Sequence, residues 1–191
     1  MDLCAITISS PRLRLASFRP SDVDEMFAAV TPSLTRFTGF DPAPSPEALA
    51  QTCAPWPAAM AEGRSLHLVV RRSWDGEFLG MTGLHRLSGS EPVVGIWIKE
   101  EAQRHGFGRE TVETVGRWAG ELLGCAAVLY PVAEENRASR AIPEGLGGAI
   151  VGHSQATKAD GRRLDLVTYR IPIGLPGAAG EDDLRRRTRA T

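Results

Sequence analysis

Apolar and polar residues alternate over several short stretches of the chain, and a period of two predicts β-strands. In the first half the predicted strands cover residues 12–18, 66–72, 78–86 and 93–99. Asp75 and Gly76 form a hairpin signal between two of these strands, and residues 88–92 form the next turn. Strands joined by such short turns pair antiparallel, so the pattern predicts an antiparallel run.

Apolar residues recur at helical spacing between the first two strands. Val23 and Met26 begin one apolar stripe, and Ser21 is the expected N-terminal cap of that helix. A second helix is expected at residues 45–63, with Ser45 as its cap. Two prolines inside this range interrupt the helix, because proline has no amide hydrogen to donate.

The middle of the chain predicts a β-α-β crossover. A long amphipathic helix is expected at residues 108–123, and Gly124 is suited to end it. Residues 125–130 are nearly all apolar, which is typical of a central strand buried on both faces. Together with strand 93–99 these elements form the crossover, and α/β proteins bind ligands at the carboxyl ends of such strands.

The last elements close the predicted fold. A short helix is expected at residues 137–142, with Asn136 as a candidate cap and Pro143 as its end. Residues 149–152 and 164–171 form a closing hairpin. The sum of these elements predicts an α/β (α+β) fold, with a mixed central sheet of about seven strands flanked by about four helices.

Composition divides the chain into one domain and a tail. Residues 1–173 hold all the predicted elements, whereas residues 174–191 are rich in glycine, alanine and charge, which indicates a disordered C-terminal tail. A net charge of −1 gives no general attraction to nucleic acid or to an anionic membrane. Three widely spaced cysteines indicate neither a disulfide framework nor a metal site. Without a secretion signal or a long apolar run, we expect a cytoplasmic protein with no membrane span.

Gly106 and Gly108 bracket a loop between strand 93–99 and helix 108–123. A glycine loop at a helix N-terminus binds phosphate, because unpaired N–H groups and the helix dipole favour an anion there. The loop lacks the lysine of a Walker A motif, and Thr111 stands where a dinucleotide fingerprint needs a third glycine. We therefore interpret the loop as a site for the pyrophosphate of a coenzyme A thioester.

Residues 103–108 fit the pattern Gln/Arg-x-x-Gly-x-Gly/Ala, which resembles the acyl-CoA loop of the GCN5-related N-acetyltransferases (GNAT). Other segments resemble the RimJ/RimL-like subgroup, which acetylates the N-termini of ribosomal proteins. They are Arg12-Leu13-Arg14-Leu15, residues 78–84, and Asn136-x-x-Ser139 followed by Glu144-x-x-Gly147. The resemblance covers residues 11–172, and the combination of motifs is more specific than any one of them.

The resemblance implies a GNAT-like fold and an N-acetyltransferase with acetyl-CoA as co-substrate. The acceptor would be a primary amine, either a protein N-terminus or a small amine, that attacks directly in a ternary complex. The pantetheine arm would pair with residues 96–98 as an extra strand, and an N–H near Ile98 would polarise the thioester carbonyl. The implied cofactor-binding residues are Ile96, Trp97, Ile98, Gln103, Arg104, His105, Gly106, Phe107, Gly108, Arg109, Asn136 and Ser139.

Two residues are candidates for the proton transfers. Ser139 is the nearest hydroxyl for the leaving thiolate, because Pro143 stands where many relatives carry a tyrosine acid. The alternative for Ser139 is a hydrogen bond to an earlier helix carbonyl, and the alternative for Asn136 is a capping role alone. His85 is the candidate base, since its ordinary pKa suits the task. Carboxylates in the turns after the neighbouring strands, such as Glu100, or a chain of water, are alternatives.

The predicted acceptor site gathers aromatic and acidic residues from several loops. They are Phe37, Phe40, Asp41, Trp56, His85 and Glu100. The aromatic residues either form a substrate wall or pack the helix pair onto the sheet. An acidic pocket would favour a cationic small amine, whereas an open groove would favour a peptide.

A second function remains open at this stage. The missing tyrosine and the lack of a carboxylate within strand 93–99 are consistent with a non-catalytic acyl-CoA-binding or assembly module. For both functions we expect no metal and no nucleic acid as partner. The resemblance also implies a homodimer as one oligomeric state.

Overall fold

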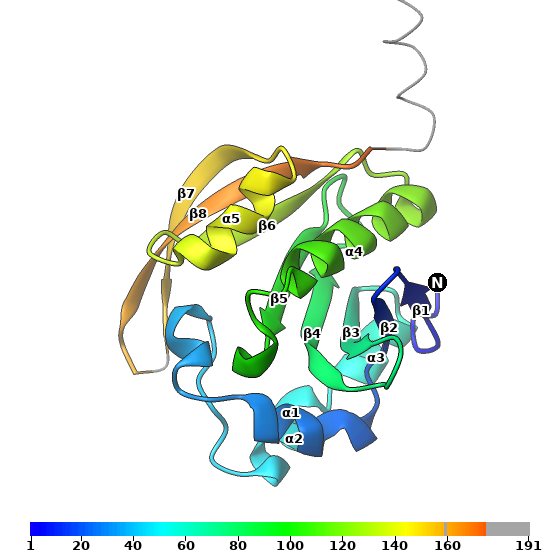
Figure 1. The fold of residues 1–191 in the computed structure, drawn as a ribbon, viewed down its shortest axis with the longest axis vertical. Coiled ribbons are helices and arrows are strands. Elements are labelled where there is room, and N and C mark those ends of the chain that lie inside the picture. Colours follow the sequence, from blue (N-terminus) through cyan, green and yellow to red (C-terminus); the bar gives the residue numbers. More distant parts are fainter. Residues whose placement is uncertain (159, 175–191) are drawn as a thin grey trace, which may run out of the picture.

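The computed structural model describes residues 1–158 and 160–174, which form an eight-stranded sheet with helices on both faces (Figure 1). The strands follow the order β1-β2-β3-β4-β5-β6-β8-β7 across the sheet. Their bounds are β1 Thr7–Ser9, β2 Leu13–Ser17, β3 Ser65–Arg72, β4 Phe78–His85, β5 Val93–Ile98, β6 Ala127–Ala133, β7 Ala149–Thr157 and β8 Arg163–Pro172. The tail predicted at residues 174–191 lies, from residue 175 onward, outside the described residues.

The sheet is mixed, as the sequence predicts. β5 and β6 are parallel, and every other neighbouring pair is antiparallel. All seven strands expected from the pattern appear, and β1 is the additional one. It has three residues, too few to show alternation in the sequence, and it forms by pairing with the edge of β2.

The helices also follow the predicted order. They are α1 Val23–Ala29, α2 Pro46–Cys53, α3 Trp56–Ala61, α4 Phe107–Leu123 and α5 Arg137–Gly145, with 3-10 turns η1 Pro20–Asp22, η2 Leu34–Phe37 and η3 Glu100–Ala102. Ser45 caps α2 by accepting a hydrogen bond from Ala48 N at 3.3 Å. The prediction that Ser21 caps the first helix is wrong. Asp22 stands at the N-cap of α1 without a side-chain cap bond, and its carboxylate instead accepts from Arg19 N at 2.8 Å across turn η1.

Helix α5 continues through Pro143 to Gly145, so its predicted end at residue 142 is wrong. Proline removes one amide donor, but its fixed φ suits a helix and its ring is buried here. Its carbonyl accepts hydrogen bonds from Gly148 N at 2.8 Å and Leu146 N at 3.1 Å. These bonds and the burial of the ring offset the lost helix bond.

The two faces of the sheet carry different helices. Helices α4 and α5 lie side by side on one face (Figure 1). A β-carbon added at Gly116 in α4 would lie 4.0 Å from Val128 Cγ2, so the even-numbered side chains of β6 face these helices. The opposite face of β3 is covered by α3, whose Trp56 stacks on His67. The two faces of the sheet therefore present different side chains to a ligand bound between its strands.

Two features are absent from the part of the chain that the structure describes, a membrane-spanning helix and a cluster of metal-binding side chains. No helix there has the length and apolar character needed to cross a membrane. Among the same residues, no group of three or more His, Cys, Asp or Glu side chains gathers as a metal site would require. Cys4, Cys53 and Cys125 are free thiols.

Candidate active site

A V-shaped gap opens between β5 and β6. The two strands meet at one register position, Val93 opposite Leu129, where Leu129 N donates to Pro92 O at 2.8 Å. Glu134 N pairs with Asp165 O, so even-numbered residues of β6 bond β8 and odd-numbered ones face β5. The next residue facing β5 is Pro131, which has no N–H to donate. Pro131 therefore ends the pairing, and the strands diverge toward their carboxyl ends.

The β5 side of the gap presents backbone groups. Lys99 N donates to Leu79 O at 2.8 Å, which sets the alternation along β5. Ile96 and Ile98 consequently turn their N–H and C=O groups away from β4 and toward the gap. Gln103 Nε2 donates to Ile98 O at 2.9 Å and so engages one of these groups. The rest of this edge has the geometry that an extended ligand uses when it adds to a sheet.

On the α3 face, two paired glycines make a hollow beside the gap. Gly83 on β4 lies opposite Gly95 on β5, and Gly95 is exposed although its strand is central in the sheet. A β-carbon added at Gly83 would lie 3.1 Å from His85 Nε2, and one at Gly95 would lie 3.9 Å from it. The imidazole of His85 thus overhangs the hollow, and any larger residue at position 83 would displace it.

His85 belongs to an aromatic group with His67 and Trp56. The rings of Trp56 and His67 stack with centroids 4.2 Å apart, and His67 meets His85 edge-on at 5.4 Å. The His67 ring also shares a hydrogen bond of 3.1 Å with Ser65 Oγ. Burial lowers the pKa of His67 to about 4, with a smaller contribution from His85. Desolvation likewise lowers the pKa of His85, so both rings are neutral at pH 7.

His67 makes the fold sensitive to acid. Its pKa is depressed in the folded state, so its contribution to stability is complete above the ordinary histidine pKa of 6.5 and is lost as the pH falls toward 4. The wild-type unfolding free energy should fall between pH 7 and pH 4.5, in part because His67 becomes protonated on unfolding. In His67→Phe, which keeps a ring on Trp56, we expect this fall to be smaller by about 2 kcal/mol, a figure already reduced for the partial exposure of His67. Urea unfolding at both pH values measures this difference. His153→Phe, on exposed β7, is the control, and equal behaviour of the two variants would contradict the prediction.

The loop before α4 has an unusual backbone. Arg104 and Gly106 both have positive φ angles, of 64° and 81°. The first helical hydrogen bond runs from Glu110 N to Gly106 O, so the N–H groups of residues 107–109 have no partner within the helix. A positive φ at arginine costs of the order of 1 kcal/mol, and such strain is often found where backbone amides meet a ligand.

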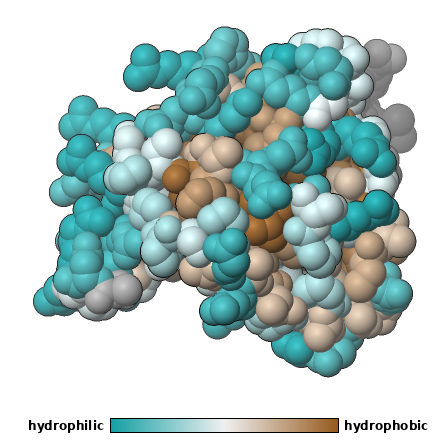
Figure 2. Space-filling model, turned by 90° about the horizontal axis from the view of Figure 1, so that it is seen from below, coloured by the Kyte–Doolittle hydropathy of each residue, from teal (hydrophilic) through white to brown (hydrophobic). Residues whose placement is uncertain are grey.

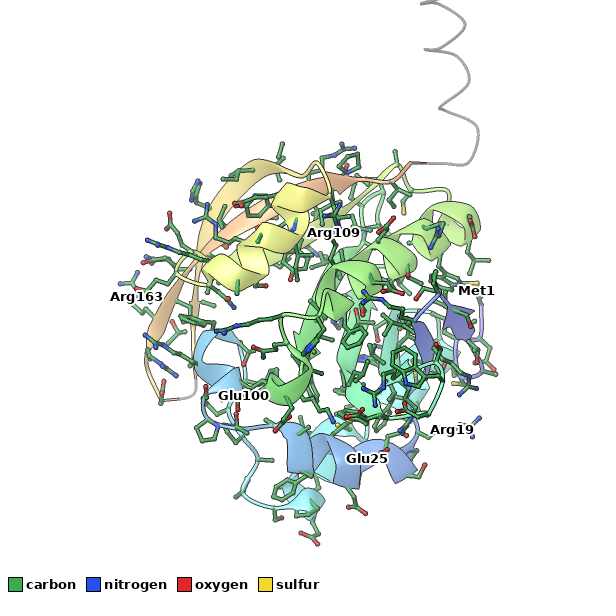
Figure 3. All side chains as sticks on the ribbon, viewed as in Figure 1. Met1, Arg19, Glu25, Glu100, Arg109 and Arg163 are labelled. Carbon is green, nitrogen blue, oxygen red and sulfur yellow. The ribbon has the colours of Figure 1, made fainter. Side chains whose placement is uncertain are left out.

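Two arginines flank this loop, and Arg12, which precedes β2, holds it. Arg12 bonds Glu110 Oε2 through Nε at 2.6 Å and His105 O through Nη1 at 3.0 Å. Its guanidinium also lies 4.9 Å from the Phe107 ring centroid. Arg109 points to the other side and lies against α5, where a β-carbon at Gly145 would be 3.2 Å from its Nη1 (Figure 3). Cationic groups therefore flank the α4 N-terminus on both sides.

Gly108 lies where α4 meets α5. A β-carbon there would be 3.0 Å from Ile142 Cδ1 of α5 and 3.8 Å from Ile98 Cγ1 of β5. The sequence predicts this glycine as a means of bringing phosphate close to the backbone. The structure adds that it also allows the N-terminus of α4, the end of β5 and α5 to converge.

Ser139 lies in the first turn of α5, and its hydroxyl meets Tyr130 of β6. The two oxygens are 2.8 Å apart. Asn136 Oδ1 accepts a hydrogen bond from Ser139 N at 3.1 Å, so Asn136 caps α5 as predicted. Burial raises the pKa of Tyr130 to about 12, although the hydrogen bond with Ser139 opposes that shift. The predicted alternative partner of Ser139, an earlier helix carbonyl, is replaced by this phenol.

The loop between α1 and α2 is tied to both sides of the gap. Lys158 is 4% exposed and donates to Thr35 O at 2.9 Å, Phe40 O at 3.1 Å and Asp41 Oδ1 at 2.6 Å. Thr31 Oγ1 donates to Glu100 Oε2 at 2.5 Å, and this bond lowers the pKa of Glu100. Two carboxylates predicted to face an amine thus have partners within the protein.

Lys158→Met is expected to lower the unfolding free energy by about 2 kcal/mol, because two carbonyls lose the buried donor that now satisfies them. Lys99 is the other lysine of the chain, and its pair with Glu77 at 2.7 Å is partly exposed. Lys99→Met is therefore the matched control, with an expected loss below about 1 kcal/mol. Urea unfolding followed by circular dichroism compares the two. Equal losses of unfolding free energy in the two variants would contradict the role of Lys158 in holding the loop between α1 and α2.

The structure sorts the predicted acceptor residues into two groups. His85 and Trp56 meet at the glycine hollow through His67, whereas Phe37, Phe40 and Asp41 lie in the loop that Lys158 holds. Phe40 is 42% exposed.

Seen from below, apolar surface gathers in the middle of the molecule inside a hydrophilic rim (Figure 2). Two hollows, of about 450 and 260 Å³, flank α4, and neither is lined by a residue of β5.

Three residues of this region are missing from the sequence prediction. Tyr130 is a phenol in an otherwise apolar strand, and a buried phenol needs a hydrogen-bond partner. His67 likewise interrupts a run of apolar residues in β3. Lys158 is one of only two lysines in the chain. Each carries a polar group in a buried setting, and that is the signal by which the sequence could have indicated them.

Comparisons with known proteins identify the family and agree with the fold. Residues 12–149 match the protein family described as acetyltransferase (GNAT) domain. No curated protein sequence matches the chain. Solved structures match its fold at low sequence identity, which is informative about architecture and leaves the substrate open.

Three of these structures illustrate the similarity. RimL, a ribosomal L7/L12 alpha-N-protein acetyltransferase in complex with coenzyme A, has a TM-score of 0.78 at 17% identity and covers 88% of this chain and 98% of its own. Spermidine N-acetyltransferase from Vibrio cholerae, with CoA and spermine, has a TM-score of 0.73 at 18% identity, covering 86% and 97%. A GCN5-related N-acetyltransferase from Brucella melitensis has a TM-score of 0.73 at 17% identity, covering 97% and 84%.

Proposed function

The chain belongs to the acetyltransferase (GNAT) domain family, whose co-substrate is acetyl-CoA, and from this premise we propose that it acetylates a primary amine by direct attack in a ternary complex. The observation that carries the proposal is the gap between β5 and β6. It is lined by backbone donors, it has a hydroxyl pair on the α5 face, and it has a neutral imidazole on the α3 face. Direct transfer needs such access from two sides.

The residues present fit acetyl-CoA. We assign the pyrophosphate to the amides of residues 107–109, with Arg104 and Arg109 adding positive charge. The pantetheine arm would extend the sheet along Ile96 and Ile98, and the Asn136 amide would bond the arm. The N–H groups of Ile96 and Ile98 both face the gap, and in this proposal the one near Ile98 would polarise the thioester carbonyl, as the resemblance implies.

The proposed reaction places its base and its hydrogen-bond donor to sulfur on opposite faces of the sheet. His85 accepts a proton from the attacking amine on the α3 face, where its lowered pKa keeps the imidazole neutral. Ser139 serves the departing sulfur on the α5 face. The carbonyl carbon lies between them in the gap, so the acetyl group moves through the plane of the sheet.

Charge around the acceptor side favours an amine with a single positive group. Asp41 is paired with Lys158, whereas the Thr31 hydrogen bond lowers the pKa of Glu100 and keeps it ionised, so of these two carboxylates only Glu100 is left to meet a positive group. The wall formed by Trp56 and the two histidines is neutral at pH 7. We therefore propose a protein N-terminus or a small monoamine as acceptor.

Release of thiol from acetyl-CoA, measured with a panel of N-terminal peptides, monoamines and polyamines, tests this function. Turnover with peptides or monoamines is the expected result. Calorimetric binding of acetyl-CoA without turnover on any amine would contradict it and favour a non-catalytic acyl-CoA-binding module. Faster turnover with spermidine than with monoamines would contradict the proposed acceptor class.

A further inference from the structure

We propose that Tyr130 is a positioning residue, which fixes the direction of the Ser139 hydroxyl toward the departing sulfur. This role rests on the proposed acetyl transfer. The phenol comes from strand β6, outside helix α5, and Pro143 of α5 stands where the resemblance places the tyrosine acid of many relatives. Tyr130 thus supplies a phenol to the same region by another route.

The geometry of the pair is tightly determined. Tyr130 is 2% exposed, and its side chain lies on the β6 face that α4 and α5 cover. Its oxygen is 2.8 Å from Ser139 Oγ. The Ser139 backbone is held by the cap from Asn136, so the hydroxyl rotor is the free variable at this residue.

The buried setting decides which hydroxyl donates. In the described part of the chain, Ser139 Oγ is the hydrogen-bond partner of the Tyr130 hydroxyl. If Ser139 donated, the phenol proton would be buried without an acceptor, which is unfavourable. Tyr130 therefore donates and Ser139 accepts.

The Ser139 proton is then free to point elsewhere. Ser139 lies three residues before Ile142, so both share the face of α5 that meets Gly108 at the start of α4. That face borders the cleft assigned to the coenzyme. A donor on it reaches the sulfur side of the gap.

The chemical step balances without proton transfer from Tyr130. The amine nitrogen forms a bond to the carbonyl carbon, the C–S bond breaks, and its electron pair goes to sulfur. Ser139 donates a hydrogen bond to that sulfur and keeps its proton, while the ammonium proton passes to His85 and then to water. The bond from Tyr130 polarises the Ser139 O–H and strengthens its donation.

The structure provides a matched control in Tyr169. This residue lies directly opposite Tyr130 in the β6–β8 register and is also 2% exposed. Its hydroxyl donates to Glu144 Oε1 at 2.6 Å and accepts from Arg140 Nε at 2.9 Å. Both tyrosines therefore hold α5 through a hydroxyl, but only Tyr130 contacts Ser139.

The test compares kcat and KM for acetyl-CoA in Tyr130→Phe, Ser139→Ala, their double variant and Tyr169→Phe. We expect Tyr130→Phe to lower kcat about tenfold with little change in KM, and the double variant to equal Ser139→Ala, because Tyr130 acts through Ser139. Tyr169→Phe should leave kcat within about twofold. Unchanged kcat in Tyr130→Phe, or losses that multiply in the double variant, would overturn this role alone. An inactive wild-type chain would instead overturn the proposed function.

A second measurement avoids any change of fold at Tyr130. The chain has two tyrosines, so 3-fluorotyrosine incorporated into Tyr169→Phe protein labels Tyr130 alone. Its fluorine NMR signal should shift when acetyl-CoA binds and the Ser139 hydroxyl turns to the sulfur. The shift should disappear in the Ser139→Ala background. A signal that responds equally in both backgrounds would overturn the proposal.

Discussion

Replacing Gly108 with valine is expected to lower the affinity for acetyl-CoA at least about a hundredfold, or roughly 3 kcal/mol. A β-carbon at this position would already lie 3.0 Å from Ile142 Cδ1, and the methyl groups of valine reach further. They would push α5 away and cover the amides of residues 107–109. Each charge-assisted hydrogen bond to phosphate contributes about 1.5–3 kcal/mol, so losing two of them accounts for the expected effect.

Isothermal calorimetry with acetyl-CoA measures the loss, and circular dichroism checks that the helices remain. Gly152→Val is the control, since Gly152 lies on β7 with open space around a β-carbon and no positive φ. Retained affinity in Gly108→Val would show that the glycine loop before α4 does not bind the pyrophosphate. An equal loss of acetyl-CoA affinity in Gly152→Val would show that the loss does not depend on the position of the glycine.

Much of the fold could be predicted because short-range signals determine its elements. Alternation, and for residues 125–130 a continuous apolar run, indicated strands of the sheet, but not β1, which is too short to alternate. Proline was harder to interpret. Pro55 separates two helices as expected, but Pro57 lies within the first turn of α3 and does not interrupt it. Pro143 is accommodated inside α5, because its ring is buried and its carbonyl bonds the following turn. Those compensations involve tertiary contacts that local pattern does not contain.

The glycine loop was predictable for the same reason, since strand, glycines and helix are consecutive. The side chains around it were not, because they come from distant parts of the chain. Arg12 meets His105 across 93 residues, and Lys158 meets Thr35 across 123. Register between strands also brings His85 to His67, and no sequence period encodes that register.

Pro131 relates a single residue of the sequence to the gap in which we place the reaction. A proline in a strand is ordinarily a defect, because it lacks the ladder donor. Here the missing donor faces β5 directly after the last paired position, Leu129. The strand keeps its bonds to β8 and loses those to β5, which leaves the Ile96 backbone groups and the Ile98 N–H available to a ligand, while Gln103 engages the Ile98 carbonyl. The missing donor of Pro131 thus lies at the register position where the β5–β6 pairing stops.

Replacing His85 with glutamine is expected to lower kcat about a hundredfold at pH 7.5, which is within the range for removing a general base. Glutamine keeps polarity and similar length but cannot accept the amine proton at neutral pH. The hollow over Gly83 and Gly95 stays open, so we expect the KM for acetyl-CoA to change little. His153→Gln, on an exposed strand, is the control for loss of a histidine.

The pH dependence of the wild-type chain separates a base from a packing residue. The pKa of His85 lies below 6.5 because its ring is desolvated, so the imidazole is neutral and able to accept a proton at pH 7. Wild-type kcat should therefore fall only as the pH drops below 6.5, and this acid limb should be absent in His85→Gln. The ratio of the wild-type kcat to the His85→Gln kcat then decreases as the pH is lowered. A constant ratio between pH 5 and 8 would mean that His85 only shapes the hollow and that water carries the proton.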